Sequence, residues 1–318
     1  MPRRHPAIFE AIFFDAPLRF RAKGTDWMIG SEQLRVSEAS ALDTAAEPRT
    51  AAVGTPIALI TWAMAASTYH RIFLGEGVLI AINVSILLYR AVGLVELIAG
   101  TIVSVLTLGV MYAFNDAYDA LADRHNPKKD QRQVSVYIDH RRACYRLLLA
   151  AKILTVVLAW VLLGPASATA TATVIAVNFI YSTTLKGVPI VDVAWCGVWG
   201  AAFAAVVLPP VDLMILVGLM TAVCHLYQAL GDRSADAQNR IMTTAVFSSG
   251  ASAIVLFVLS AMIGMMLRDP FGDLLALSAL IPFALFFLLR NSHLAWVLTK
   301  LYYGVMWLLV LGPGRALV

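Results

Sequence analysis

Long apolar stretches separated by short polar segments constrain the fold of this chain more than any other feature of its sequence. A helix needs about 17–25 mostly apolar residues to cross the hydrocarbon core of a bilayer. Because a chain exposed to lipid must satisfy its backbone hydrogen bonds internally, each such stretch is expected to be helical. The expected spans are about 73–92, 94–115, 146–164, 167–185, 189–209, 211–230, 242–267, 273–290 and 293–312.

The composition also indicates a membrane protein. Of the 318 residues, 60% are hydrophobic and 14% are charged, whereas a soluble domain averages about 45–50% apolar and about 25% charged residues. The net charge of +4 fits basic loops beside a membrane and requires no nucleic-acid partner. The three cysteines show neither metal-ligand spacing nor a disulfide framework. We therefore predict an all-α polytopic membrane protein with about nine transmembrane helices.

Three parts of the chain are expected. Residues 1–72 would form a cytoplasmic or interfacial N-terminal arm, residues 73–312 the nine-helix domain, and residues 313–318 a short tail. The first 50 residues are polar and mixed, so no cleavable signal peptide is expected there. Short amphipathic pieces are expected in the arm, around Ile8–Phe20. The apolar stretch Pro56–Thr68 is too short to span and favours a re-entrant or interfacial segment.

The loop after the second span sets the expected orientation. It holds the densest group of basic residues in the chain, and such loops tend to stay on the cytoplasmic side. These residues are Arg124, Lys128, Lys129, Arg132, Arg141, Arg142 and Arg146. Alternating the spans from this loop places the N-terminal arm in the cytoplasm and the C-terminus outside it.

A group of acids closes the second span. The apolar run Leu94–Phe114 is followed by Asn115, Asp116, Asp119 and Asp123. On a helix the three aspartates stand at i, i+3 and i+7, so they project from one face. Three ionised carboxylates this close repel one another unless a cation lies between them. Oxygen ligands of this kind suit Mg²⁺, which commonly bridges a few carboxylates to substrate phosphates. The motif therefore indicates a diphosphate site at a membrane surface.

A second acidic pair follows the sixth span. Asp232 and Asp236 are i, i+4 neighbours on a helix, and they align with Asp119 and Asp123 of the first motif. Four spans separate the two motifs, so both are expected on the same side of the membrane. Two or three Mg²⁺ ions and a diphosphate held between them would let the metal neutralise charge on the leaving group. Acids in membranes also serve as proton relays, so an ion-coupled transporter is the non-enzymatic alternative.

These residues resemble the UbiA superfamily of intramembrane prenyltransferases, over residues 73–312. The resemblance rests on five segments: Asn115-Asp116-x-x-Asp119-x-x-x-Asp123, Asn126–Arg132, Tyr181–Lys186, Asp232-x-x-x-Asp236, and Asp236–Arg240 followed by Thr243–Ala245. The resemblance implies nine transmembrane helices around a central cavity that is capped on the cytoplasmic side and opens laterally to lipid. It also implies Mg²⁺-dependent ionisation of an isoprenyl diphosphate at a site that faces the cytoplasm.

The resemblance further assigns roles to individual residues. The residues expected to bind Mg²⁺ and diphosphate are Asn115, Asp116, Asp119, Asp123, Asp232 and Asp236. Lys129 and Arg132 would clamp phosphate oxygens, Lys as a point charge and Arg in bidentate fashion. Lys186 would be a third cation at the leaving group. Tyr181 would either face a carbocation or serve as an interfacial belt aromatic.

Several functions remain open on this reading. In the leading one, the prenyl group passes to an acceptor, aromatic or lipid-like. In a terpene cyclase of the same superfamily, the cation would instead be trapped by its own double bonds. Phosphoribosyl transfer to a polyprenyl phosphate is a third branch, which the second acidic pair disfavours. Departures from the family pattern, such as Gln133 after Arg132, concern the acceptor side most. Asp192 in the fifth span is expected to have a partner, since an acid is costly in a membrane.

Overall fold

The computed structural model describes residues 55–72, 75, 77–126 and 129–312. Within these ranges every regular element is helical and there is no strand. The amphipathic piece expected around Ile8–Phe20 and the tail at residues 313–318 lie outside the described residues. The described residues from Ile60 onward group as one compact unit, and every residue of the candidate site belongs to it.

Six of the described helices are long and apolar enough to cross a bilayer. They are α4 (Leu94–Asp119), α6 (Arg141–Leu163), α7 (Pro165–Ile180) continued by the π-helical turn η3 (Tyr181–Leu185), α9 (Val211–Gln238), α11 (Ser249–Phe271) and α14 (Ser292–Val310). Three shorter apolar segments are α3 (Gly77–Tyr89), α8 (Val191–Ala204) with η4 (Ala205–Val207), and α12 (Asp273–Ser278) followed by α13 (Ile281–Leu288). Together these segments fall on the expected stretches. The all-α membrane fold is confirmed, and the count of nine spans stays a prediction.

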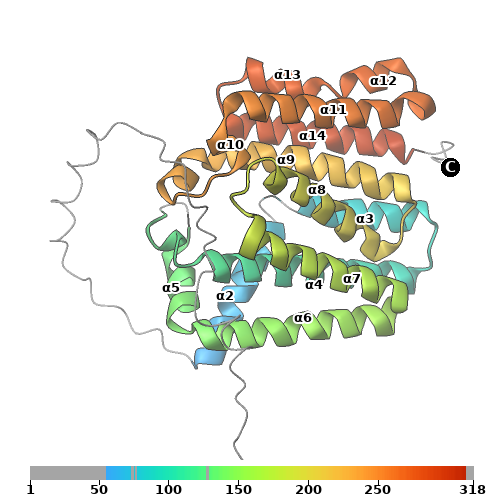
Figure 1. Ribbon diagram of the computed structural model, residues 1–318. Helices are drawn as coiled ribbons and strands as arrows, with labels where there is room; N and C mark the ends of the chain where they lie inside the picture. Colours follow the sequence, from blue (N-terminus) through green and yellow to red (C-terminus); the bar gives the residue numbers. More distant parts are fainter. Residues whose placement is uncertain (1–54, 73–74, 76, 127–128, 313–318) are drawn as a thin grey trace, which may run out of the picture. The chain divides into compact units, whose positions relative to one another are not determined.

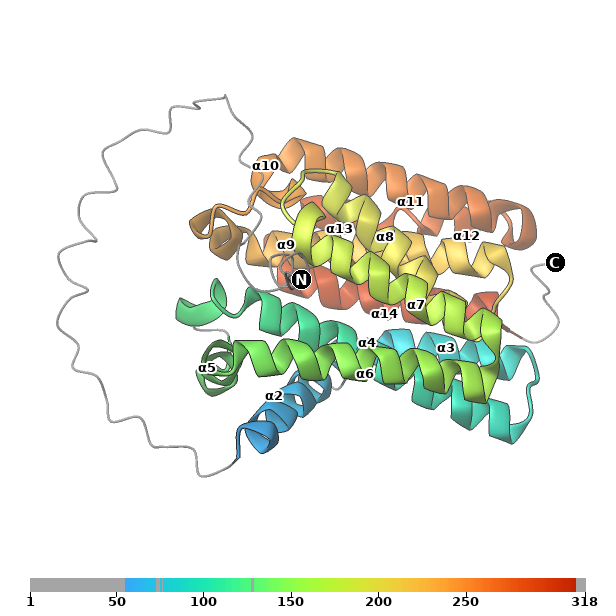
Figure 2. The ribbon, with the colours of Figure 1, turned by 60° about the horizontal axis from the view of Figure 1, so that its bottom comes forward.

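Helix α9 is a central element of the unit and packs against α8, α11 and α14, while α4 packs against α3 and α6. Figures 1 and 2 show these long helices running alongside one another. Small residues let α8 and α9 approach closely. A Cβ on Gly200 would lie 2.3 Å from the Thr221 Oγ1, and one on Gly218 would lie 2.7 Å from the Gly197 carbonyl oxygen. Larger residues would therefore push α8 and α9 apart.

A short helix, α5 (Gln131–Asp139), follows the first acidic motif. It begins at Asp130, whose side chain accepts hydrogen bonds from the backbone N–H groups of Arg132 at 2.9 Å and Gln133 at 3.4 Å. Such a side-chain cap satisfies donors that the first helical turn leaves free. Figure 1 shows α5 and α10 (Thr244–Phe247) at the same end of the helix bundle.

The stretch expected to be interfacial forms most of helix α2 (Pro56–Arg71). Polar contacts tie α2 to α5, because the Gln133 amide donates to the Ser67 hydroxyl at 2.5 Å and to the Ala63 carbonyl at 2.9 Å. The Tyr137 hydroxyl also lies 2.9 Å from that of Ser67. Residues from Ile60 to the end of α2 thus pack with the transmembrane helices. The boundary expected at residue 72 stays a prediction about the arm that precedes them.

Candidate active site

Both acidic motifs border one cavity of about 720 Å³. Asn115, Asp116, Asp119 and Asp123 reach it from α4 and the segment after it, and Asp232 and Asp236 reach it from α9. Residues more than 100 positions apart in the chain therefore meet at one place, as the matched spacing of the motifs predicts. The individual roles of these residues stay predictions.

The first motif does not lie on one continuous helix, and here the sequence expectation is wrong. Helix α4 ends at Asp119, and Asp123 opens the separate 3₁₀ turn η2 (Asp123–His125). Asn126 adopts an extended conformation, with ψ of 111°, as expected for a residue that precedes a proline. The Asn126 amide donates to the Asp123 carboxylate at 3.2 Å, which helps to hold Asp123 at the cavity.

Two cations, Arg71 and Lys129, pair with Asp116, and Lys129 also pairs with Asp123. The Lys129 ammonium lies 3.1 Å from the Asp116 carboxylate and 3.3 Å from that of Asp123, so it bridges both. The Arg71 guanidinium lies 3.6 Å from Asp116 and over the Tyr112 ring, 4.8 Å from its centroid. Arg71 precedes the first span directly in the sequence, and only this juxtamembrane position hinted at a role. Its ion pair with Asp116 could not be inferred from spacing.

Lys186 interacts with both acidic motifs. Its ammonium lies 2.5 Å from the Asp119 carboxylate. Burial alone would lower the pKa of Lys186, but the charge of Asp119, its hydrogen bond, and the nearby Asp236 and Asp123 together raise that pKa above its ordinary value. The π-helical turn η3 positions this side chain, because the Lys186 N–H bonds to the Tyr181 carbonyl at 2.8 Å. Such turns are frequent at functional sites.

Asn115 is held by two donors from α7 and η3. Its carbonyl oxygen accepts hydrogen bonds from the Ser182 hydroxyl at 2.6 Å and the Asn178 amide at 3.1 Å. An amide oxygen has two lone pairs, so a metal ion bound by Asn115 would displace one of these donors. The Tyr181 hydroxyl lies 3.3 Å from the His225 ring nitrogen, and both residues line the cavity.

Arg132 is the one predicted site residue that the structure does not bring to the cavity. Its exposed guanidinium lies over the Trp62 ring of α2, 4.7 Å from the centroid. The reason is the register of α5, in which Gln133, Val134 and Tyr137 turn inward and Arg132 turns outward. The proposed bidentate clamp by Arg132 has no support in this geometry.

The other end of the cavity is apolar and aromatic. Helix α9 carries a stripe that changes from Met220 and Cys224 to Gln228 and then to the acids. Trp199, Tyr303 and Trp307 line the cavity there, whereas Tyr112 lines it nearer the acids, with the Arg71 guanidinium over its ring. Trp307 of α14 donates to the Ser85 hydroxyl of α3 at 2.7 Å and links the two helices there.

Lys300 on α14 also lines the cavity, and sequence reasoning did not single it out. Its ammonium donates to the Gly75 carbonyl at 2.6 Å and lies 3.7 Å from the centroid of the Trp296 ring. A lone lysine inside an apolar span was the available signal, since charged residues in membranes are expensive and tend to face a cavity.

The donor chemistry fits Mg²⁺ as a partner of substrate phosphates. Carboxylate and amide oxygens face one cavity, and these are hard ligands of the kind that Mg²⁺ takes. Among the described residues, no three histidine, cysteine, aspartate or glutamate side chains converge closely enough to enclose an ion by themselves. Mg²⁺ is usually held by one or two carboxylates together with phosphates and water.

Asp192 has a partner, as expected. It is fully buried at the start of α8. Its carboxylate accepts hydrogen bonds from the backbone N–H groups of Val193 and Thr244, both at 2.9 Å. These donors satisfy the carboxylate within the protein, and Asp192 is not among the residues that line the cavity.

Solved structures share this fold. A UbiA homologue from Archaeoglobus fulgidus bound to DMAPP and Mg²⁺ matches with a TM-score of 0.55 and 14% identity, over 76% of this chain and 99% of that one. The homologue bound to GPP and Mg²⁺ matches with a TM-score of 0.56 and 15% identity, over 76% and 97% of the two chains. A Cd²⁺-bound form matches with a TM-score of 0.51 and 16% identity, over 76% and 99%.

None of the curated protein sequences matches this chain. The model of the UbiA prenyltransferase family does match it, over residues 72–304. That range includes both acidic motifs, the basic segment between α4 and α5, and η3. Together with the apolar helices, it identifies an integral, multi-pass membrane protein. The chain belongs to the UbiA prenyltransferase family.

Proposed function

We propose that this protein is a Mg²⁺-dependent intramembrane prenyltransferase that ionises an isoprenyl diphosphate and transfers the prenyl group to an acceptor. One observation carries the proposal: both acidic motifs border a single cavity whose other end is apolar and aromatic. An amphiphile with a diphosphate head and a hydrocarbon tail matches this gradient. The matched archaeal structures, which hold DMAPP or GPP with Mg²⁺, support the same substrate class.

The charges of the cavity support this assignment. Its lining holds five carboxylates and the cations Arg71, Lys129, Lys186 and Lys300, which leaves one negative charge. A prenyl diphosphate carries about three negative charges at neutral pH, so its complex with two Mg²⁺ ions carries about one positive charge. Bound Mg²⁺ would neutralise charge that develops on the leaving diphosphate. The complex would therefore enter a cavity of opposite net charge.

The lysines exchange partners in this scheme. Without substrate, Lys129 and Lys186 neutralise the acids, at N···O distances of 2.5–3.3 Å. With the diphosphate bound, the carboxylates would hold Mg²⁺, and the two ammonium groups would contact phosphate oxygens as point charges. Arg71 lies beside them and can hold a further oxygen in a forked geometry. The carboxylates and the ammonium groups of these ion pairs would thus both contribute to binding of the Mg²⁺–diphosphate complex.

The remaining residues act on the prenyl group. The C–O bond to the diphosphate breaks, its electron pair leaves with the diphosphate, and an allylic cation remains. Tyr181 borders the cavity beside Asn115 and Lys186, where an aromatic face can stabilise that cation. The acceptor then forms a bond to the carbon and loses a proton. The apolar lining keeps water, a competing nucleophile, away from the cation.

The active site faces the cytoplasm in this proposal. Arg124, Lys129, Arg141 and Arg142 lie near the same ends of α4 and α6 as the acids. Basic loops beside transmembrane helices favour the cytoplasmic side. The diphosphate would therefore enter from the compartment in which the loop lies.

A terpene cyclase is the second candidate, favoured by the aromatic residues that line the cavity. Tyr112, Trp199, Tyr303 and Trp307 could stabilise a cation that migrates along a folded chain. Cyclisation needs the same diphosphate site and no acceptor.

The test uses purified protein with Mg²⁺ and C10, C15 or C20 diphosphates, with and without a lipid extract as the acceptor source. Transfer predicts prenylated products only with the extract, whereas cyclisation predicts hydrocarbons or alcohols without it. Mg²⁺-dependent binding of a non-cleavable prenyl thiodiphosphate is measured in parallel. If the protein neither binds nor converts any of the three substrates, the proposal is refuted and the transporter alternative remains.

A further inference from the structure

A buried polar contact joins the start of α8 to the start of α10. Asp192 accepts the N–H of Thr244 at 2.9 Å, and the Thr244 hydroxyl donates to the same carboxylate. The Thr244 oxygen in turn accepts the Ile190 N–H at 2.6 Å. Asp192 and Thr244 are both fully buried, and a buried carboxylate is stable only when hydrogen bonds compensate for lost water. These two residues are called the Asp192–Thr244 latch below.

The latch holds one loop in an unfavourable conformation. Ile190 has a φ of 70°, a region in which a β-branched residue is rare. Such a residue persists only where its surroundings fix it. Here the Thr244 hydroxyl fixes it, because it accepts the Ile190 N–H. The end of the segment that runs from Lys186 to Ile190 is therefore tied to Thr244.

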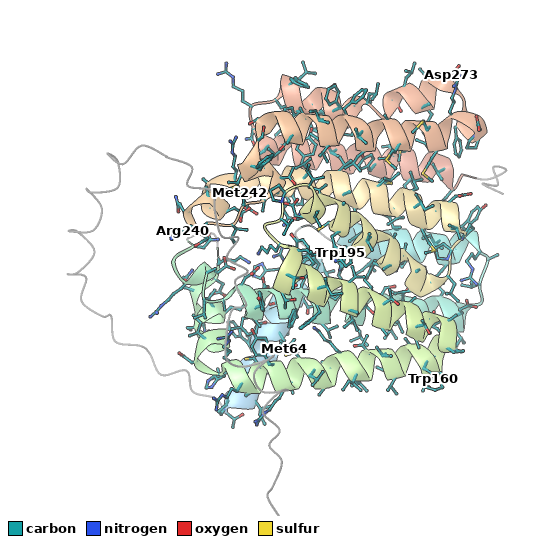
Figure 3. All side chains as sticks on the ribbon, in the orientation of Figure 1. Met64, Trp160, Trp195, Arg240, Met242 and Asp273 are labelled. Atoms are coloured by element: carbon teal, nitrogen blue, oxygen red, sulfur yellow. The ribbon has the colours of Figure 1, made fainter. Side chains whose placement is uncertain are left out.

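A second loop packs on the first. It connects α9 to α10 and includes Arg240, whose φ is 56°. A Cβ on Gly187 would lie 3.2 Å from the Ile241 side chain and 3.4 Å from the Met242 nitrogen, so the two loops are in direct contact. Figure 3 shows Arg240 and Met242 together at one end of the bundle, far from Trp160 at the other end.

Each loop supplies a contact to a different acidic motif. The first delivers Lys186 to Asp119 at 2.5 Å. The second delivers Thr243, whose hydroxyl donates to the Asp236 carboxylate at 3.3 Å. The latch joins the far ends of both loops, since Ile190 and Asp192 follow Lys186 and Thr244 follows Thr243.

We infer that the Asp192–Thr244 latch positions the two acidic motifs relative to each other, by fixing Lys186 against Asp119 and Thr243 against Asp236. Asp192 and Thr244 do not line the cavity, so they are positioning residues. The inference rests on the proposed function for its consequence: loss of the latch weakens binding of the Mg²⁺–diphosphate complex. Removing groups that orient metal ligands typically costs about 10–100-fold in affinity.

The first test needs no substrate. Thr244→Val keeps the shape of the side chain and removes its hydroxyl, and Thr244→Ser restores the hydroxyl. Thr171→Val is the matched control, because Thr171 is also fully buried and its hydroxyl has no hydrogen-bond partner within the described structure. The rate at which an amine reagent labels Lys186 is measured by mass spectrometry, with Lys129 as the internal reference. Faster labelling of Lys186 in Thr244→Val alone is expected, and an unchanged rate would overturn the inference.

The second test is Mg²⁺-dependent binding of a prenyl thiodiphosphate to the same variants. We expect Thr244→Val to bind about 10–100-fold more weakly, and Thr244→Ser and Thr171→Val to bind like the native protein. If the native protein does not bind at all, the proposed function fails, while the labelling result still decides the position of Lys186. Native-like binding by Thr244→Val would refute the latch alone. Should Thr244→Val not fold, Asp192→Asn is measured in both assays against the same criteria.

Discussion

Replacing Lys186 by methionine should have opposite effects on the two ligands of the site. The ammonium of Lys186 occupies Asp119 at 2.5 Å in the structure. Any divalent cation that binds Asp119 alone must therefore break this ion pair. Lys186→Met removes that competition, so the free protein should bind a divalent cation more tightly. The same change removes a cation from the phosphates, so the diphosphate should bind more weakly.

The size of the first effect follows from the geometry. A hydrogen bond between charged groups contributes about 1.5–3 kcal/mol. The Lys186 and Asp119 side chains are 26% and 24% exposed, so solvent screening favours the lower end of that range. About 1.4 kcal/mol corresponds to a tenfold change in a dissociation constant. We therefore expect Lys186→Met to tighten divalent-cation binding about tenfold in the absence of diphosphate.

The assay is a titration with Mn²⁺, a paramagnetic substitute for Mg²⁺, followed by electron paramagnetic resonance in detergent or nanodiscs. Lys300→Met is the matched control, because Lys300 lines the same cavity but donates to the Gly75 carbonyl. The affinity of the Lys300→Met variant for Mn²⁺ should stay within about twofold of the native value. Equal or weaker Mn²⁺ binding by Lys186→Met would refute the exchange of partners between lysines and metal ions.

Three further predictions concern single residues. Asp232→Asn should abolish turnover without unfolding the protein. Asp273→Asn should leave both turnover and folding unchanged, because Asp273 is an exposed acid on α12 at the opposite end of the bundle (Figure 3). Turnover and melting temperature of both variants decide this, and an active Asp232→Asn would contradict the metal site. Gly304→Leu should shorten the longest prenyl chain accepted, because a Cβ there enters open space in the cavity wall. A Cβ on Gly93 also meets open space, but Gly93 does not line the cavity, so Gly93→Leu should not change the longest prenyl chain accepted. Competition between prenyl diphosphates of different lengths measures this for both variants. Arg132→Ala should leave the KM for the diphosphate within about threefold of the native value, because Arg132 lies on Trp62; a larger rise would show that α5 moves on binding.

The spans and the meeting of the acids could be predicted from the sequence. Hydropathy locates long apolar helices because the bilayer requires about 20 residues for each crossing. Asp232 and Asp236 could be placed opposite Asp119 because an even number of spans returns the chain to the same side. Both inferences depend on local pattern and on counting, and neither needs the packing of side chains.

Contacts between distant segments could not be predicted in this way. Arg71 contacts Asp116, and Asp192 contacts Thr244, although these residues are far apart in the sequence. The periodicity of a helix indicates only contacts between residues a few positions apart. The outward direction of Arg132 depends on the cap at Asp130, which sets where α5 begins. Family resemblance could suggest that Arg132 lies close to the site, but it could not give the face of α5 on which Arg132 stands.

The break after Asp119 shows a limit of helical-wheel reasoning. The i, i+3, i+7 spacing placed Asp123 on the face of a continuous helix, but the chain leaves the helix at Asp119 and turns before Asp123. Pro127 was visible in the sequence and disfavours helix at the residue before it. Asp123 nevertheless borders the cavity, because Asn126 and Lys129 hold it there.

In the proposed function, both acidic motifs hold one diphosphate. A double-mutant cycle of Asp119→Asn and Asp232→Asn, read out as Mg²⁺-dependent binding of a non-cleavable prenyl thiodiphosphate, measures this directly. Groups that share one ligand are coupled, typically by about 0.5–3 kcal/mol, whereas independent sites add within about 0.3–0.5 kcal/mol. We predict a coupling free energy above about 1 kcal/mol between the two substitutions. Additive losses of binding free energy would contradict a shared diphosphate and would show that the two motifs bind different ligands or groups.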